Sequence, residues 1–177
     1  MVVDDACQII VACDVTDQSN DKQQAVPMAA QALANLEAAG IERPRTADGS
    51  VQKIAAALDA GYFSATTVAG LEALDIDPYL ATERHKHHAA PAAAGAVANG
   101  ATAKERMRAK VQTALGRAVY GLRKGVVEPV FGQIKGARGF RRFLLRGLAK
   151  VRGEWRLVCL THNLLKLWRY GCAPVVS

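Results

Sequence analysis

Three features that would direct a chain to a membrane, to secretion or to a thiolate metal site are missing from this 177-residue sequence. No apolar run approaches the roughly 20 residues that span a bilayer. The N-terminus, "MVVDDACQIIVACDV", carries acids where a secretory signal carries basic residues. The four cysteines include no C-x-x-C pair, so zinc-ribbon and thioredoxin-like motifs are unsupported. We therefore expect a cytoplasmic protein with no membrane partner, whose cysteines are free thiols.

Acidic residues are scarce in the second half of the chain. Residues 104–177 contain 17 Lys and Arg against 3 Asp and Glu, a net charge of +14, whereas residues 1–103 contain 6 against 13, a net charge of −7. Glu128 stands alone before a basic run, and no further acid occurs until Glu154. Such a positive excess favours a polyanionic partner, most simply nucleic acid, over a basic face that only keeps the protein soluble.

The hydrophobic pattern predicts an α/β fold. Half of the residues are hydrophobic, enough for one sizeable core, so we expect a single domain over residues 1–177. Strand-like and helix-like segments alternate, which indicates a layered structure with partly parallel strands. Residues 84–103 form an Ala/Gly/Pro-rich, low-complexity linker within the domain, and the chain after it reads as helical to near its end. The predicted strands cover 7–16, 51–59 and 76–82, and the predicted helices 25–40 and 65–74.

Histidines occur in two settings. His85, His87 and His88 lie together in "RHKHH", but no carboxylate or cysteine stands at ligand spacing, which favours a solvated loop over a metal site. His162 belongs to the apolar stripe of the last predicted helix and is expected in the core. The stripe consists of Val151, Trp155, Val158, His162, Leu165 and Trp168.

Two carboxylates are candidates for chemistry. Asp59 ends a predicted strand just before the Gly61 turn, a position that opens onto the ligand side of an α/β sheet. It is either a turn or capping residue or a metal ligand. Glu128 lies in an apolar helical stretch and needs compensation if buried, either from a salt bridge with Arg123 or Lys124 or from a divalent cation.

Together the two carboxylates provide the minimum for phosphoryl chemistry with a hard cation. Mg²⁺ prefers oxygen ligands, and two such ions about 4 Å apart activate a nucleophile and stabilise a leaving oxygen. Lys135 follows Glu128 by about two helical turns, so both are expected on nearly the same face, with Tyr120 close to it.

The segment "YGLRKGVVEPVFGQIK" (120–135) resembles the C-terminal signature of bacterial insertion-sequence transposases with a DDE catalytic triad. In that signature a tyrosine, an arginine, the third catalytic glutamate and a lysine recur. Tyr120, Glu128 and Lys135 match it, and either Arg123 or Lys124 supplies the basic position. The segment "LDAGYFS" is similar to the surroundings of the second aspartate, which corresponds to Asp59. The tail "GFRRFLLRGLAKVRGEWRLVCLTHNLLKL" also fits, so the resemblance covers nearly the whole chain.

The resemblance implies an RNase H-like mixed sheet with flanking helices, incomplete at the N-terminus, and a helix-rich C-terminal half. It implies transposition of DNA, with Asp59 and Glu128 as catalytic ligands of Mg²⁺ or Mn²⁺. It also implies transposon ends and target DNA as partners, a homodimer on DNA as one possible assembly, and a bacterial cytoplasmic location associated with the nucleoid. The implied DNA-binding residues are Tyr120, Arg123, Lys124, Lys135, Arg138, Arg141, Arg142 and Arg146.

The sequence departs from the family at its start. Relatives carry the first catalytic aspartate on an upstream strand, and Asp4, Asp5 and Asp14 occupy the wrong motif positions. We therefore expect an N-terminally truncated transposase that is inactive by itself. Two alternatives stay open: a basic DNA-binding module without catalysis, and a repair or junction nuclease on the same fold.

Overall fold

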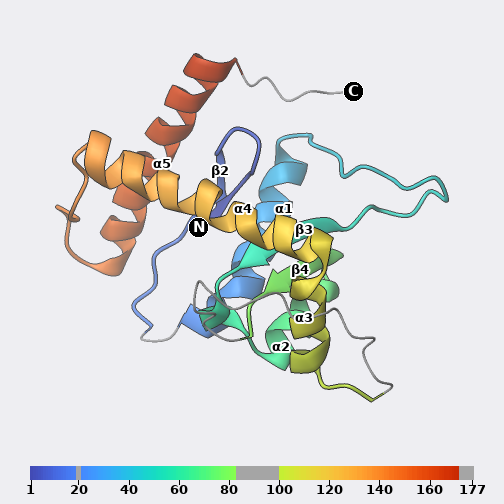
Figure 1. Cartoon of the computed structure of the whole chain (residues 1–177). Helices are drawn as coiled ribbons and strands as arrows, with labels where there is room; N and C mark the ends of the chain where they lie inside the picture. Colours follow the sequence, from blue (N-terminus) through green and yellow to red (C-terminus); the bar gives the residue numbers. More distant parts are fainter. Residues whose placement is uncertain (19–20, 83–99, 172–177) are drawn as a thin grey trace. The chain divides into compact units, whose positions relative to one another are not determined.

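The computed structural model describes residues 1–18, 21–82 and 100–171, and Figure 1 labels its helices α1 to α5 and its strands β2 to β4. The chain divides into two compact units. We call Met1–Ser19, Pro27–Glu42 and Lys124–Ser177 the terminal unit, and Asn20–Val26 and Arg43–Arg123 the central unit. The architecture is mixed α/β and rich in helix, as predicted. Within the described residues the strands form two separate two-stranded sheets.

The central unit is built on a strand–helix–strand motif. Strands β3 (Ile54–Leu58) and β4 (Ile76–Leu80) pair in parallel and in register, which confirms the predicted parallel pairing. Helix α2 (Ala65–Glu72) connects them. The Ser64 side chain accepts a hydrogen bond from the backbone N–H of Thr67 at 2.9 Å and so caps α2, as its position before the helix predicts.

Helix α3 (Ala103–Gln112) completes the core of this unit. Met107 of α3 is buried, as are Leu71 of α2 and Leu80 of β4. The Lys110 ammonium lies 2.5 Å from the Asp77 carboxylate and 4.2 Å from the centre of the Tyr79 ring. Lys110 thus brings its charge to the edge of β4 with a carboxylate and an aromatic face as partners.

The junction between α3 and helix α4 (Ala114–Gly132) requires a glycine. A Cβ atom at Gly116 would lie 2.0 Å from the backbone carbonyl oxygen of Lys110, closer than any side chain tolerates. The Thr113 hydroxyl accepts the N–H of Gly116 at 2.9 Å. The two helices therefore meet backbone to backbone, and any larger residue at Gly116 would force them apart.

The terminal unit begins with a short hairpin. Strand β1 (Val2–Val3) pairs antiparallel with β2 (Ile10–Ala12), so the predicted strand at 7–16 is wrong in length. The Asp4 carboxylate accepts the backbone N–H groups of Ala6, Cys7 and Ile9, and Gln8 has a φ of 59°. Residues 4–9 consequently form a turn, because their amide groups bind a side chain instead of a neighbouring strand.

The cysteines follow this local structure. Cys13 and Cys159 are free thiols, as predicted, whereas Cys7 is disulfide-bonded and the prediction is wrong there. The prediction placed Cys7 and Cys13 on one face of a single strand. Cys7 lies instead in the turn before β2, so its surroundings differ from those of Cys13.

Helix α1 (Ala25–Ala38) follows the short 3₁₀ helix η1 (Asp21–Gln24) and corresponds to the predicted helix. It ends before Gly40, whose φ of 71° lies in the left-handed region that glycine adopts without strain. The Asn35 amide donates a hydrogen bond to the Val11 carbonyl oxygen at 2.8 Å, which ties α1 to β2.

Helix α4 continues into a π turn, η3 (Gln133–Ala137), and the long helix α5 (Leu148–Tyr170) follows after a non-helical loop. Pro129 lies inside α4 and has no N–H for the carbonyl of Gly125 four residues earlier. The Gln8 side-chain amide donates to that carbonyl at 3.1 Å. The hydrogen bond that the proline removes is therefore replaced by one from the N-terminal turn.

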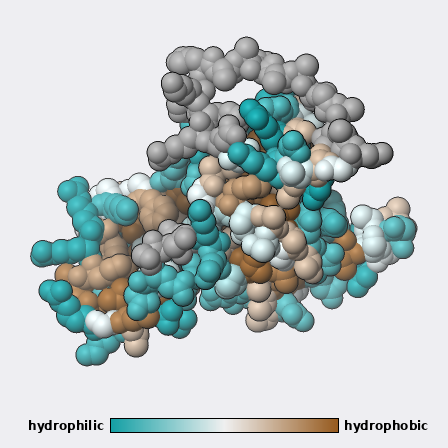
Figure 2. Space-filling model, turned by 90° about the horizontal axis from the view of Figure 1, so that it is seen from below, coloured by the Kyte–Doolittle hydropathy of each residue, from teal (hydrophilic) through white to brown (hydrophobic). Residues whose placement is uncertain are grey.

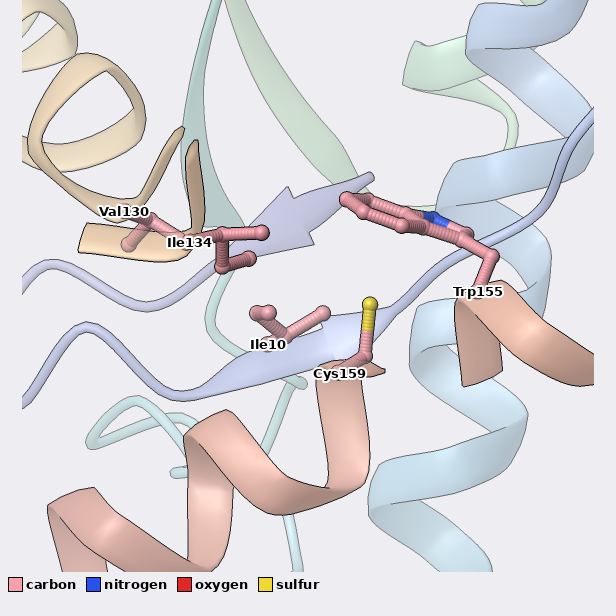
Figure 3. Packing of buried hydrophobic residues seen from close by; sticks show 5 residues of the cluster. All are labelled: Ile10, Val130, Ile134, Trp155 and Cys159. Atoms are coloured by element: carbon pink, nitrogen blue, oxygen red, sulfur yellow. The ribbon is translucent and has the colours of Figure 1, made fainter. Parts of the chain in front are cut away.

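The core of the terminal unit gathers side chains from four elements. Ile10 from β2, Val130 from α4, Ile134 from η3, and Trp155 and Cys159 from α5 converge in Figure 3. Burial at 126, 130 and 134 recurs every four residues, so one face of α4 and η3 points into this core.

The predicted stripe of α5 is confirmed only in part. Trp155 is buried and His162 is 1% exposed, but Trp168 is 86% exposed and the prediction is wrong for it. Lys166 is buried in its place, because its ammonium donates to the Gln8 side-chain oxygen at 2.8 Å. The outer face of α5 carries exposed leucines, and Figure 2 shows hydrophobic surface lying open among hydrophilic side chains. Among the described residues, no helix has both the length and the apolarity needed to cross a bilayer.

Candidate functional site

Asp59 lies directly after the carboxyl end of β3, where the sequence predicts a ligand-facing residue. It stands at the N-cap position of the short helix η2 (Ala60–Tyr62) but makes no side-chain capping hydrogen bond. Its carboxylate instead lies 2.5 Å from a terminal nitrogen of Arg123, with side-chain exposures of 61% for Asp59 and 17% for Arg123. Asp59 is thus a turn residue, because its backbone carbonyl accepts the N–H of Tyr62 at 3.0 Å, while its carboxylate forms an ion pair instead of a capping hydrogen bond.

Tyr120 completes this group. The centre of its ring lies 5.4 Å from the Arg123 guanidinium carbon, within the range of a cation–π contact. Burial raises the pKa of the Tyr120 hydroxyl, an effect that the Arg123 charge opposes and the Asp59 charge reinforces. The structure thus brings Asp59 together with two predicted site residues, Tyr120 and Arg123, that lie more than 60 positions later in the sequence.

Glu128 lies on the solvent side of α4. The core-facing residues of this part of the helix are Val126 and Val130, and Glu128, halfway between them, projects from the opposite face and is exposed. Because the Glu128 side chain is exposed, the compensation that burial would require does not arise. Arg123, one of the two partners predicted for Glu128, forms its ion pair with Asp59.

Lys124 and Lys135 are both exposed. Lys135 lies in η3, and its ammonium is 5.0 Å from the centre of the Phe131 ring. The prediction that Lys135 and Glu128 share a face assumed an uninterrupted α-helix. The wider π turn rotates Lys135 about the helix axis relative to that expectation. Lys135 remains available to solvent and to a phosphate.

The remaining basic residues lie in a loop between η3 and α5, which we call the basic loop (138–147). The prediction of continuous helix is wrong here, since Gly139 and Gly147 have φ values of 69° and 84° that interrupt it. Arg138 donates to the Val158 carbonyl at 3.2 Å and to the Thr161 hydroxyl. The arginines that project from the loop, exposed and without an ion pair to any described residue, are Arg141, Arg142 and Arg146.

Glu154 organises the basic loop. Its carboxylate accepts the backbone N–H of Leu144 at 2.8 Å and that of Leu145 at 3.0 Å. The rings of Phe140 and Phe143 lie 6.3 Å and 6.2 Å from that of Trp155 on the same helix. Glu154 therefore binds the backbone of the basic loop and does not neutralise its arginines, so the positive charges of the loop remain exposed together.

The described residues contain no group of three or more histidine, cysteine or acidic side chains close enough to hold a metal ion. Asp59 belongs to the central unit and Glu128 to the terminal unit. His85, His87 and His88 lie outside the described residues, whereas the prediction of a core position for His162 is confirmed.

Comparison with known proteins bears on the part of the chain that holds Glu128 and the basic loop. A family model described as a transposase DDE domain matches residues 86–168. Over these residues, slightly less than half of the chain, the protein is similar to the DDE transposase family. No curated protein and no solved structure matches the chain.

The transposase match covers Tyr120, Arg123, Glu128, Lys135 and the basic loop, and it begins after Asp59. The role of Asp59 therefore rests on its sequence surroundings and on its contact with Arg123, a residue inside the match. Glu154 was absent from the predicted site. The sequence feature that could have indicated Glu154 is that it is the one acidic residue between Glu128 and the C-terminus.

Proposed function

We propose that the chain acts in DNA transposition as part of an RNase H-like DDE transposase catalytic domain, with Asp59 and Glu128 as the second and third catalytic carboxylates. The observation that carries this proposal is the transposase DDE match over residues 86–168. Two features of the structure support it. Asp59 stands at the carboxyl end of a parallel strand, and Arg123 of the matched segment lies against it.

The proposal includes a divalent cation. Carboxylate oxygens are the ligands that Mg²⁺ prefers, and the Asp59 and Glu128 side chains are both open to solvent. These two residues would hold Mg²⁺ or Mn²⁺. A bound ion would supply activation of a water or a 3′-hydroxyl and neutralise charge at the leaving oxygen.

The DNA backbone would be held mainly by the basic loop and Lys135. Exposed guanidinium groups bind phosphate oxygens in a planar, two-pronged geometry, and a loop fixed by Glu154 and Trp155 presents them at lower entropic cost than a mobile tail. Lys124 and Arg138 extend this surface. Because Arg138 also anchors the loop to α5, its loss should weaken DNA binding through loop geometry as well as charge.

The chain matches two of the three carboxylates of the family, so we propose that it does not cut DNA by itself. The test is nicking of supercoiled plasmid by the purified chain with Mn²⁺, compared with the Asp59→Ala variant. No nicking by either protein is expected. Robust nicking that Asp59→Ala abolishes would overturn the proposed inactivity and establish Asp59 as catalytic.

A second candidate is a DNA-binding module without chemistry. It is favoured by the Arg123 guanidinium that occupies Asp59 and by the solvated position of Glu128. The two candidates differ in metal dependence: DNA affinity and Mn²⁺ binding are coupled in a catalytic relative, whereas a simple binder is indifferent to EDTA. Both require affinity that falls steeply with salt.

A further inference from the structure

Arg123 is held in a setting that suits it for exchange between two partners. One terminal nitrogen of the guanidinium lies 2.5 Å from an Asp59 carboxylate oxygen. Its Nε is buried and has no hydrogen-bond partner among the described residues. Arginine carries five N–H donors, and a buried donor without an acceptor costs free energy. The guanidinium is thus anchored by Asp59 and Tyr120 while part of its hydrogen-bonding capacity remains unused.

The ion pair also changes what Asp59 offers to a cation. A carboxylate that already faces a guanidinium at hydrogen-bond distance attracts a second cation less, because the two positive charges repel each other. The 61% exposure of the Asp59 side chain shows that its carboxylate is otherwise reachable from solvent. The obstacle to a metal ion at Asp59 is therefore Arg123 itself.

A DNA phosphate is a suitable alternative partner for Arg123. Its oxygens match the planar fork of a guanidinium and accept two parallel hydrogen bonds. Tyr120 would keep the guanidinium plane in place during the exchange, since a cation–π contact does not depend on which anion the nitrogens bind.

Resting on the proposed function, we propose that Arg123 is a positioning residue that occupies Asp59 until a DNA phosphate binds the guanidinium and frees the carboxylate for a divalent cation. DNA and metal then bind cooperatively. By linkage, DNA raises the affinity for the metal by the same factor by which the metal raises the affinity for DNA. The exchange would withhold the metal from Asp59 when no DNA is present.

The experiment measures Mn²⁺ binding to the full chain by electron paramagnetic resonance, with and without a short duplex. Asp59→Asn should lower the affinity measured with duplex. Arg123→Gln should raise the affinity measured without DNA by about fivefold or more, the lower end of typical coupling between sites. Duplex should raise the affinity of the wild type and have little effect on Arg123→Gln. Arg117→Gln removes the same charge from an exposed position of α4 and should behave as the wild type.

The outcomes separate the two proposals. If Asp59→Asn lowers Mn²⁺ affinity but Arg123→Gln leaves it unchanged, the positioning role of Arg123 is wrong and the proposed function stands. If Asp59→Asn has no effect on Mn²⁺ affinity in the presence of duplex, Asp59 is not a metal ligand and the proposed function loses that residue. If Arg123→Gln fails to fold, Arg123→Lys takes its place, because it keeps the charge but loses the planar fork. This variant should retain part of the block on Mn²⁺ binding. A Mn²⁺ affinity equal to that of the wild type, both with and without duplex, would contradict the exchange.

Discussion

The basic loop allows a quantitative prediction about DNA binding. Its three projecting arginines, Arg141, Arg142 and Arg146, are exposed and free of ion pairs with described residues. Each phosphate neutralised contributes about −0.9 to the slope of log affinity against log salt on duplex DNA. Changing all three to glutamine should reduce the magnitude of the slope by about 2.7. Between 50 and 200 mM salt, the variant should therefore lose ~40-fold less affinity than the wild type.

The assay is fluorescence anisotropy of a labelled 20-base-pair duplex, titrated with protein at several salt concentrations. A control variant with the same change in charge, Arg43→Gln/Arg45→Gln/Lys53→Gln in the acidic half, should keep the wild-type slope. Equal reductions in both variants would show that net charge alone sets the affinity. An unchanged slope in the loop variant would refute the assignment of this loop to DNA.

Three further predictions concern the terminal unit. Glu154→Ala should lower the free energy of unfolding by about 1–2 kcal/mol in urea denaturation, because the loop N–H groups that donate to Glu154, including that of Leu144, lose a charged acceptor. An unchanged free energy of unfolding would mean that the aromatic contacts alone hold the loop. Burial lowers the pKa of His162, so the unfolded chain binds a proton below about pH 6.5 that the native chain does not. Stability should then fall between pH 7 and 5 by up to about 1.4 kcal/mol per pH unit, and His162→Asn should reduce that slope; an identical slope would place the titration elsewhere. A hydrogen bond from Cys159 lowers the pKa of the Cys13 thiol from 9.0 to about 7, so alkylation of Cys13 should be half-maximal near pH 7 and shift towards pH 9 in Cys159→Ala, and a midpoint that stays unchanged would contradict that hydrogen bond.

The elements predicted correctly are those with local signals. Helix α2 has its serine cap and a face of Val68 and Leu71, and β3 and β4 are short apolar runs bounded by turns. These features act within a few residues, so the sequence displays them directly. Asp59 was correctly placed at the end of its strand for the same reason.

The elements predicted wrongly depend on side-chain hydrogen bonds that the hydrophobic pattern does not display. The first strand is short because the Asp4 carboxylate accepts hydrogen bonds from the amide groups of the following turn. Lys166 is buried because its ammonium donates a hydrogen bond to the side-chain oxygen of Gln8, 158 positions earlier. The hydrophobic period of α5 indicates a stripe but does not show which of several neighbouring faces will be covered.

The same limit applies to the site. The transposase-like signature identified Tyr120, Glu128 and Lys135 by their spacing, yet it could not indicate that Arg123 pairs with Asp59, 64 positions away. A contact of this kind depends on how the chain after α3 returns to the end of β3. The role of Glu154 was not predicted, because its partners are backbone N–H groups, which every residue except proline carries and which therefore leave no pattern in the sequence.

The central proposal is that Asp59 and Glu128 are both ligands of a divalent cation. The most direct measurement is Mn²⁺ binding, by electron paramagnetic resonance in the presence of duplex DNA, to the wild type, Asp59→Asn, Glu128→Gln and the double variant, after subtraction of the ions bound by DNA alone. Shared ligation predicts that each single change weakens the same site and that the double variant loses little more than either single one. Strictly additive losses, or full Mn²⁺ affinity in Glu128→Gln, would contradict the account.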